Sequence, residues 1–359
     1  MKKLIALFLV LLPIGPIVAL LLAFVGGFLI FAQATTLQVK PEEAMLVEGS
    51  CHEILLKSNE IRLLTWNMGY GALDERQDCY WDGGKGVYGE SKEIVLDNVS
   101  AIKEKIKEED PDIFFIQEAD RNSKRSYYIN EYNSFKDTFG FEYQTSFAGN
   151  FKAGLVPLPL YKMTGKVDAG IASFSKYHFM DSTRIQLPIP FSWPMSLFNL
   201  KRCLLVNHIE IQGTEKQLVV INLHLEAYDD GDGKAKQLAM LMDLMKEEYD
   251  KGNYVIAGGD FNQTFSTTNY EKYPKMTDWV CPVIDASKYQ SFTFKMDDSV
   301  PTCRSLNKVY ENADKDNFQY YMIDGFIVSN NITINSFKTL DLDFKNTDHN
   351  PVRMAISLN

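Results

Sequence analysis

The stretch Asp112-Ile-Phe-Phe-Ile-Gln-Glu118 decides the fold of this chain of 359 residues. Its body is apolar from Ile113 to Ile116, and two polar residues follow. An apolar run of this length with a polar end predicts a strand that lies in a core and stops at a surface. We therefore expect a core strand that presents Gln117 and Glu118 for chemistry.

A helix is expected before this strand. Apolar residues recur between Val95 and Ile106 at intervals of four, three and four residues, which is the spacing of one helix face. Ser91 is a favourable residue to begin that helix, and Asp110-Pro111 ends it. Before the helix, residues 61–66 predict another buried strand, which a glycine-rich loop follows.

The rest of the chain adds more strands and a second helix. Apolar residues from Leu238 to Tyr249 have helical spacing. Further strands are predicted over residues 169–175, 203–211, 217–223, 253–259, 322–329, 332–340 and 352–357. Many strands, with hairpins and few helices, indicate an α/β fold of two packed sheets flanked by helices, in one large domain over residues 61–359.

The composition narrows the class of protein. Hydrophobic residues make up 45% and charged residues 23%, which is typical of a globular protein and excludes a disordered, collagen-like or disulfide-dense chain. The formal net charge of -10 argues against a protein that binds nucleic acid over its whole surface. It does not exclude an enzyme with a small basic or metal-bearing cleft, because attraction depends on the local field.

The N-terminus is expected to be a membrane anchor. Leu4 to Ala32 form an uncharged run of 29 residues, and about 20 suffice to cross a bilayer. Lys2 and Lys3 precede the run, so the positive-inside rule places the rest of the chain outside the cytoplasm. We expect residues 1–34 to be an anchor and 35–60 a connecting segment. The alternative is a cleaved signal with secretion, since Ala32-Gln33-Ala34 resembles a cleavage site.

The cysteines do not indicate a metal ribbon. Five cysteines are scattered without a C-x-x-C spacing, which disfavours a zinc ribbon or a thioredoxin-like site. A disulfide such as Cys281–Cys303 is compatible with the sequence, and an odd count leaves at least one thiol free.

Polar residues gather at the ends of six predicted strands. They are Trp66-Asn67, Gln117-Glu118, Asn222-Leu223-His224, Gly259-Asp260-Phe261-Asn262, Ile323-Asp324-Gly325 and Thr347-Asp348-His349-Asn350-Pro351. If these ends meet at one rim, they form an oxygen-rich site. Such a site suits Mg²⁺ or Mn²⁺ better than zinc.

This ordered set resembles the endonuclease/exonuclease/phosphatase superfamily, whose members share the deoxyribonuclease I-like fold. The likeness covers residues 61–358, and six motifs in family order are more specific than any one of them. The resemblance implies a four-layer α/β sandwich and Mg²⁺-dependent hydrolysis of a phosphoester by water, without a covalent enzyme intermediate.

The resemblance also implies a metal site and a place for the nucleophile. Glu118 corresponds to the principal metal ligand, Asn67 lies beside it, and Asp348 is a candidate second contact. Asp260 and Asn262 stand where the family orients the nucleophile and contacts the phosphate.

Two histidines complete the implied site. Asp324 and His349 resemble the family's carboxylate–imidazole pair, and either Asp260 or His349 is the general base. His224 stands where the deoxyribonuclease I branch has a histidine, and abasic-site nucleases have asparagine there. It is expected to protonate the leaving oxygen or to bind a phosphate oxygen.

Each assignment has a structural alternative. Asn67 and Asp260 are also common turn residues, Asp324 before Gly325 is a turn signal, and His349 could be a hydrogen-bonded core histidine. Only the joint order of the motifs favours catalysis. Arg121 could contact a substrate phosphate or belong to a solvated basic loop.

The substrate stays open at this point. Placement outside the cytoplasm favours a nuclease-like phosphodiesterase, with a sphingomyelinase-like lipid phosphodiesterase or an inositol-phosphate phosphatase as alternatives. A nuclease predicts a basic groove, whereas a lipid enzyme predicts exposed apolar loops beside the site. The apolar stretch 191–198 could touch lipid, although a cap on the core is favoured. A catalytically silent surface binding protein is the alternative of another class, and no obligate protein partner is indicated.

Overall fold

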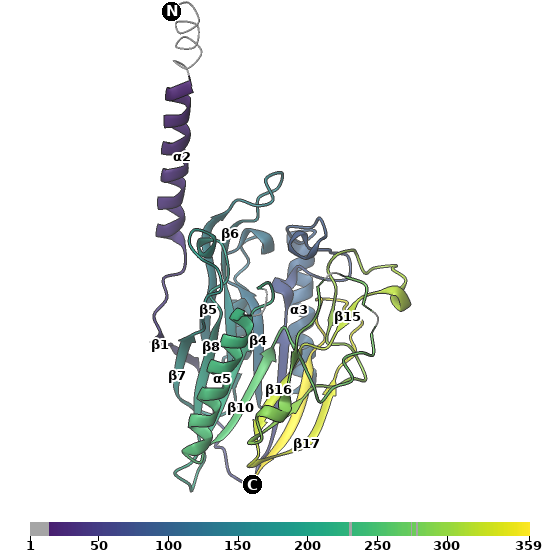
Figure 1. Ribbon diagram of the computed structural model, residues 1–359. Coiled ribbons are helices and arrows are strands. Elements are labelled where there is room, and N and C mark those ends of the chain that lie inside the picture. Colours follow the sequence, from purple (N-terminus) through teal and green to yellow (C-terminus); the bar gives the residue numbers. More distant parts are fainter. Residues whose placement is uncertain (1–13, 230–231, 274, 278) are drawn as a thin grey trace, which may run out of the picture.

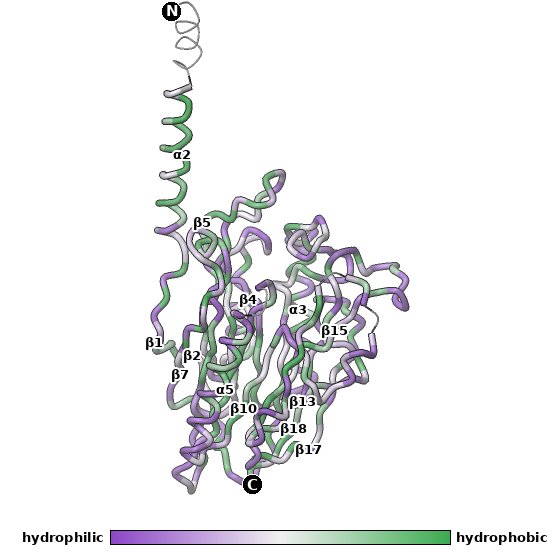
Figure 2. Tube along the Cα trace, in the orientation of Figure 1, coloured by the Kyte–Doolittle hydropathy of each residue, from purple (hydrophilic) through white to green (hydrophobic). Residues whose placement is uncertain are grey.

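The computed structural model describes residues 14–229, 232–273, 275–277 and 279–359. A long helix, α2 (Ile14–Thr35), projects from one end of a domain built on two seven-stranded sheets (Figure 1). Apolar residues cover α2 along its exposed length (Figure 2), and it is long enough to cross a bilayer. The expected N-terminal apolar helix is therefore present. Lys2, Lys3 and the rest of the run before Ile14 lie outside the described residues.

Both sheets are mixed. The first has the order β1 (Glu42–Ala44), β7 (Phe179–Gln186), β8 (Cys203–Glu210), β9 (Gln217–His224), β10 (Tyr254–Asp260), β16 (Asp324–Ser329), β13 (Phe292–Lys295). The second has the order β17 (Ile332–Thr339), β18 (Val352–Leu358), β3 (Glu60–Asn67), β4 (Ile113–Asp120), β6 (Gly165–Ser175), β5 (Gln144–Val156), β2 (Val47–Gly49). Residues 35–60 thus supply an edge strand to each sheet.

Among the described residues, three helices flank the sheets. α3 (Lys92–Glu109) and α4 (Glu131–Phe139) cover the second sheet, and α5 (Asp232–Asp250) covers the first. Short strands form two further pairs, β11 (Thr264–Phe265) with β12 (Val283–Ile284) and β14 (Cys303–Arg304) with β15 (Tyr320–Tyr321). Short 3-10 helices lie at η1 (Gly69–Gly71), η2 (Tyr80–Asp82), η3 (Lys124–Ser126), η4 (Met195–Leu197), η5 (Ala286–Lys288) and η6 (Lys315–Asn317). The expected four-layer α/β sandwich is confirmed.

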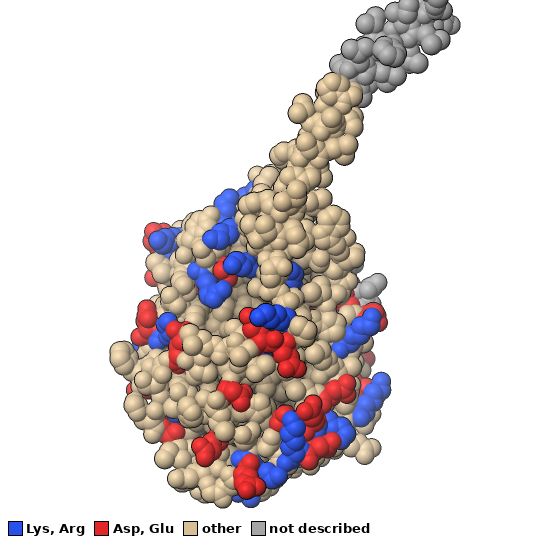
Figure 3. Space-filling view, turned by 90° about the vertical axis from the view of Figure 1, so that its left-hand side faces the viewer, with Lys and Arg blue, Asp and Glu red and all other residues tan. Residues whose placement is uncertain are grey.

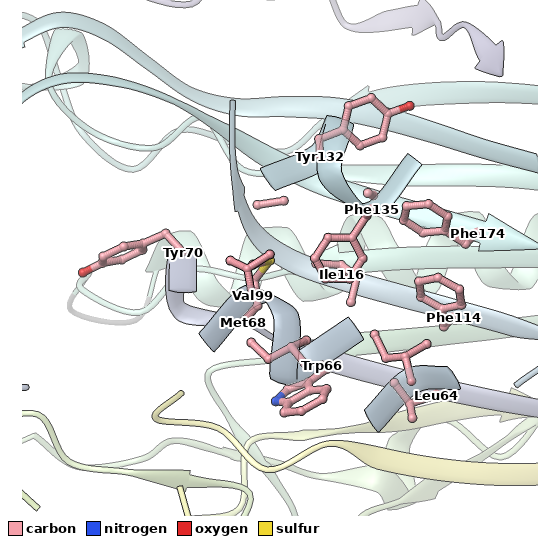
Figure 4. Close-up of a cluster of buried hydrophobic side chains, with 14 of the residues drawn as sticks. Leu64, Trp66, Met68, Tyr70, Val99, Phe114, Ile116, Tyr132, Phe135 and Phe174 are labelled. Carbon is pink, nitrogen blue, oxygen red and sulfur yellow. The ribbon is translucent and has the colours of Figure 1, made fainter. Parts of the chain in front are cut away.

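Strand alternation explains the layers. On β4, Ile113 and Phe115 face the space between the sheets, whereas Phe114 and Ile116 face the helices. Figure 4 shows the helix-side cluster, in which Phe114 and Phe174 stack with centroids 4.4 Å apart. A strand covered on both faces has an apolar residue at every position, which is why this run is uninterrupted.

α3 begins and ends where the sequence predicts, with its caps at Ser91 and Asp110. The Ser91 hydroxyl accepts a hydrogen bond from the backbone N–H of Ile94 at 3.3 Å, and this caps the first turn. Asp110 ends the helix in the left-handed region, with φ +43°.

Some elements escaped sequence analysis. The structure adds β5, β7, β13 and α4 to the predicted set. Glycine, asparagine and lysine interrupt the apolar pattern of β5, at Gly149, Asn150 and Lys152. Its pairing with β6 holds it in place instead, since tertiary context overrides weak local propensity. The Cys281–Cys303 disulfide, which the sequence left open, does not form, because all five cysteines are free thiols.

One edge of the sandwich carries the polar strand ends. β3, β4, β9 and β10 all end there, because β3 runs parallel to β4 and β9 parallel to β10. The turn between β5 and β6 and the loop between β7 and β8 lie at the same edge, since β6 is antiparallel to β4 and β8 to β9. α2 leaves the domain here, while the C-terminus lies at the opposite edge (Figure 1). We call this side of the domain the α2 edge.

Candidate active site

The predicted metal and catalytic residues meet at the α2 edge. Asn67 ends β3, Glu118 lies near the end of β4, His224 ends β9, Asp260 ends β10, Asp324 begins β16, and Asp348 and His349 precede β18. The register places Asp260 opposite both His224 and Asp324. The two sheets therefore contribute side chains to one cluster.

Asp260 is the centre of this cluster. Its Oδ2 accepts a hydrogen bond from Asn67 Nδ2 at 3.1 Å. The same oxygen lies 3.3 Å from His224 Nε2 and 3.8 Å from His349 Nε2. Burial, together with repulsion from the Asp324 carboxylate, raises the pKa of Asp260 to about 7. A carboxyl group with such a pKa can accept a proton from water near neutral pH.

Glu118 reaches the cluster from the second sheet. The register of β4 shifts between Ile116 and Ala119, and Glu118 has φ +56°. A bulge of this kind redirects a side chain, and a left-handed non-glycine residue costs about 1–3 kcal/mol. Glu118 Oε1 accepts a hydrogen bond from Asn67 Nδ2 at 3.2 Å. The backbone is thus strained in the conformation that aims this carboxylate at Asn67.

A buried ion pair supports the strand just beyond Glu118. Asp120 pairs with Arg125 at 2.9 Å, and the Arg125 guanidinium lies 3.7 Å from the centroid of the Tyr70 ring. Glu131 accepts a hydrogen bond from the Asp120 backbone N–H at 2.7 Å. Sequence analysis missed this network, since spacing alone did not show that Arg125 would fold back onto β4.

Asp324 and His349 form the expected carboxylate–imidazole pair. His349 Nδ1 lies 2.8 Å from Asp324 Oδ2, and both residues are buried. Burial alone would lower the pKa of His349, but the negative field of Asp324 and its neighbours outweighs it and raises the pKa well above its usual value. The imidazole is therefore held as imidazolium, with Nε2 directed toward Asp260 and Asp348.

His224 behaves in the opposite way. Burial, with the positive charges of Arg202 and His349, holds the pKa of His224 well below its usual value. Its Nδ1 lies 3.9 Å from Glu118 Oε1 and has no hydrogen-bond partner among the described residues. His224 is therefore a neutral imidazole with a free ring nitrogen.

Asn262 lies on the loop that leaves β10. Its backbone N–H donates to Asp260 Oδ1 at 2.8 Å, and its side-chain Nδ2 donates to the Leu225 carbonyl at 2.9 Å. Gly259 makes this turn possible, because a Cβ there would lie 2.0 Å from the Leu223 carbonyl oxygen. The G-D-F-N sequence therefore positions the Asp260 carboxylate.

Gln117 and Asn222 lie below the site rather than in it. Gln117 Nε2 donates to Asn222 Oδ1 at 2.8 Å and to Thr65 Oγ1 at 3.1 Å. All three side chains are buried between the sheets. Their hydrogen bonds join the two sheets beneath the cluster and fix the spacing of the strands that carry it.

The donor set fits a hard divalent cation. Four carboxylates, from Glu118, Asp260, Asp324 and Asp348, gather in a largely buried space, and burial with repulsion from Glu118 raises the pKa of Asp348. One oxygen or nitrogen atom each from Asp260, Asp324 and His349 lies within 4.8 Å of the others. A cation would relieve the repulsion, and carboxylate and amide oxygens are the ligands that Mg²⁺ prefers.

Arg121 is not brought into the cluster. Its guanidinium pairs with Asp168 at 2.9 Å and lies 4.5 Å from the centroid of the Phe147 ring. Its predicted contact with substrate stays a prediction, and the structure gives it a structural role on β6.

The mouth of the site carries a pair that sequence analysis missed. Tyr228 Oη donates to Asp82 Oδ1 at 3.2 Å. Desolvation, with the negative field of Asp348 and Glu118, raises the pKa of Asp82 to about 6. The glycine-rich sequence around Asp82 predicts only a rim loop, and nothing in it shows that the carboxylate would face the site.

Comparisons with known proteins agree with this fold. The model of the endonuclease/exonuclease/phosphatase family matches residues 64–337. A protein described as endonuclease/exonuclease/phosphatase from Beutenbergia cavernae is 16% identical, with a TM-score of 0.55 over 84% of this chain and 72% of that one. Another from Bacteroides vulgatus is 16% identical, with a TM-score of 0.53 over 84% and 100% of the two chains.

A third solved structure shares the fold. Zebrafish (D. rerio) TDP2, complexed with a single-strand DNA product, is 14% identical, with a TM-score of 0.52 over 83% of this chain and 99% of that one. No curated protein sequence matches the chain significantly. At sequence identities this low, the structural likeness establishes a common fold.

Proposed function

Since the chain belongs to the endonuclease/exonuclease/phosphatase family, we propose that it is a divalent-metal-dependent phosphodiesterase that hydrolyses its substrate by direct attack of water. The observation that carries the proposal is the Asp260-centred cluster, in which carboxylates and two histidines of opposite pKa shift meet at one edge of the fold.

We propose that Glu118, Asn67 and Asp348 bind the cation. These residues supply oxygen ligands from three separate segments, and the strained backbone of Glu118 indicates a position held for function. When bound, Mg²⁺ or Mn²⁺ neutralises charge on a phosphate oxygen and lowers the pKa of water.

We assign the role of general base to Asp260. Its pKa of about 7 matches the task of a general base near neutral pH, and Asn67 and Asn262 hold its two oxygens in place. The Asp324–His349 pair supplies an imidazolium that stabilises negative charge on the phosphate as water attacks.

His224 is assigned to substrate binding. Since its pKa is lowered, it is a poor acid, and its ring N–H serves to donate a hydrogen bond to a phosphate oxygen. Asn262 is assigned to the same phosphate. We propose a diester as the substrate, because His224 stands where the deoxyribonuclease I branch has a histidine.

The structure favours one substrate class over the other. Arg121 and Arg125, which a nuclease could use to grip phosphates, are both held in ion pairs. Exposed apolar side chains lie at the same edge as the site, as a lipid phosphodiesterase requires, and Lys124 and Lys162 accompany them. We further propose that residues 1–34 anchor the chain and that residues 61–359 form the catalytic domain outside the cytoplasm, while residues 35–60 connect the two and add an edge strand to each sheet.

The activity can be tested with the full chain in detergent micelles. We expect hydrolysis of bis(4-nitrophenyl) phosphate with Mg²⁺ or Mn²⁺ and none with EDTA. Plasmid DNA, RNA, sphingomyelin and phosphatidylinositol phosphates complete the panel and identify the substrate class.

Glu118→Gln is expected to abolish metal-dependent turnover, because it removes the charge that binds the cation. Glu142→Gln is the matched control, since Glu142 is an exposed carboxylate before β5, at the opposite edge. Full activity of Glu118→Gln, or equal loss in both variants, would reject the assigned metal site.

A further inference from the structure

The α2 edge presents aromatic and apolar side chains around the mouth of the site. The exposed ones include Trp81, Leu158, Leu160, Tyr161, Trp193 and Tyr228. They belong to four separate segments: η2, the β5–β6 turn, the β7–β8 loop and the loop after β9. Leu160 is 75% exposed and Trp193 is 61% exposed, so neither is a cap on the core. Clusters of this kind mark surfaces that contact another apolar phase.

Three of these segments, the β5–β6 turn, the η2 loop and the loop after β9, touch one another in turn. The Tyr161 ring, on the β5–β6 turn, lies edge-on to Tyr80 with centroids 6.2 Å apart, and its hydroxyl donates to the Lys85 carbonyl at 3.3 Å. Asp82 then accepts the hydrogen bond from Tyr228 at 3.2 Å. The apolar surface is thus continuous with the loop that carries Asp82.

α2 is packed against the same surface. The Phe28 ring stacks on Phe198, in the β7–β8 loop, with centroids 5.6 Å apart. The backbone N–H of Gly154, near the end of β5, donates to the Thr35 hydroxyl at 3.2 Å. These contacts fix the direction in which α2 leaves the domain. A membrane that receives α2 therefore faces the α2 edge (Figure 1).

The length of the apolar run allows close approach. The uncharged run ends at Ala32, and about 20 of its 29 residues suffice to cross the hydrocarbon. Phe28 and Ala32 can then lie at the membrane surface while they pack on the domain. The loops beside Phe198 and Gly154 lie at the same depth.

Basic residues accompany the apolar ones. Lys124 and Lys162 lie over the Tyr88 ring from two different loops, with Nζ 5.0 Å and 4.7 Å from its centroid. Figure 3 shows Lys and Arg side chains on the part of the domain surface beside the base of α2. Although the chain is acidic overall, this edge offers positive charge to anionic head groups.

We propose that the α2 edge docks on the bilayer that α2 enters, and that the site takes its phosphodiester from lipid head groups in that surface. Tryptophan and tyrosine prefer the interface between water and hydrocarbon, and lysine extends its ammonium group to the head groups. Docking places the mouth of the site against the bilayer, so a head group reaches it without leaving the membrane. The lipid part rests on the proposed function, whereas the docking part does not.

Docking is tested by fluorescence quenching of the full chain in nanodiscs of phosphatidylcholine and phosphatidylglycerol, with and without brominated acyl chains. In a Trp81→Phe/Trp193→Phe background, which removes both exposed tryptophans of the α2 edge, Leu160→Trp adds a single tryptophan there. Phe141→Trp adds one before β5, at the opposite edge, where Phe141 is 82% exposed. We expect brominated lipid to quench the tryptophan at position 160 and to leave that at position 141 unchanged. Equal quenching, or none at position 160, would overturn docking.

The lipid substrate is tested by paired activities. Leu160→Glu/Trp193→Glu is expected to lower hydrolysis of bilayer phospholipid by at least about tenfold, because two apolar anchors are lost, and to leave bis(4-nitrophenyl) phosphate hydrolysis unchanged. Phe141→Glu/Ile54→Glu, with both changes at the opposite edge, is the control that should change neither.

The outcomes separate the two proposals. If the chain cleaves no diester with any metal, the proposed function fails while quenching still decides docking. If the soluble diester is cleaved but bilayer lipid is not, or nucleic acid is cleaved in its place, the lipid substrate is rejected and the proposed function stands. An equal loss on both substrates in the Leu160→Glu/Trp193→Glu variant would also reject the lipid substrate.

Discussion

The two histidines of the site differ in charge at the same pH, one being a cation and the other neutral, because they have different neighbours. On one side, His349 lies 2.8 Å from Asp324 and faces Asp260 and Asp348, so that its pKa is raised. On the other, burial and the positive charge of Arg202 lower the pKa of His224, although its Nδ1 lies 3.9 Å from Glu118 Oε1. We call these the His349 side and the His224 side.

The difference teaches that residue type does not fix a role. Both imidazoles lie within 4 Å of the same oxygen of Asp260. Only the surroundings make one a cation suited to stabilise a phosphate and the other a neutral hydrogen-bond donor. Changes on the two sides should therefore have different sizes and different pH dependence.

The largest effect is expected on the His349 side. Asp324→Asn keeps the shape of the pair but removes the charge that favours imidazolium, so the pKa of His349 falls. We expect kcat on bis(4-nitrophenyl) phosphate to drop by about 10²–10³-fold, as for loss of one group that stabilises charge in the transition state. The pH–rate profile should lose its plateau on the alkaline side, because His349 then deprotonates at lower pH.

His349→Ala should give a similar loss in kcat, since both variants remove the same cation. The double variant should be no worse than either alone, because the two residues act as a unit. Additive losses would show that Asp324 does not act through His349.

A smaller effect is expected on the His224 side. His224→Asn keeps a donor toward the phosphate while it removes the imidazole, so we expect a loss in kcat/KM of about tenfold, which is below the range of about 10²–10⁴-fold for general acid–base groups. The alkaline plateau should be retained, because His349 is unchanged. A loss as large as that of Asp324→Asn would mean that His224 is the acid and that its neutral state is wrong.

Much of this site could be predicted from the sequence, because its residues follow strands with strong apolar patterns. Ile113 to Ile116 predict a strand, so the position of Glu118 at a strand end could be read directly. The directions of the strands bring their polar ends together at one edge of the fold. The six motifs in family order already imply this meeting. The α/β layers and the family were predictable for the same reason.

Sequence could not predict what depends on contacts across the fold. Arg125 lies a few residues beyond Asp120, yet only the folded chain shows their ion pair and the Tyr70 ring beneath it. Arg121 stood as a candidate substrate contact because its partner, Asp168, is distant in sequence. The charge states of His224 and His349 are also set by distant residues, and so is the position of α2 beside the mouth of the site.

The smallest expected effect is a difference in the pH dependence of stability, measured by urea unfolding of the full chain in micelles with EDTA. The folded pKa of His224 is below its unfolded value of about 6.5, so below that pH the unfolded state binds the extra proton. The stability of the wild type relative to His224→Asn should therefore fall by about 1.4 kcal/mol per pH unit as the pH drops below 6.5.

For His349 the sign is reversed. Its folded pKa is above the unfolded value, so its contribution is fully present below about pH 6.5 and is lost as the pH rises through the folded pKa. The wild type relative to His349→Gln should thus lose stability toward alkaline pH, where the His224 comparison is flat. Parallel slopes in the two comparisons would mean that the histidines share one charge state, and the distinction between the two sides would fail.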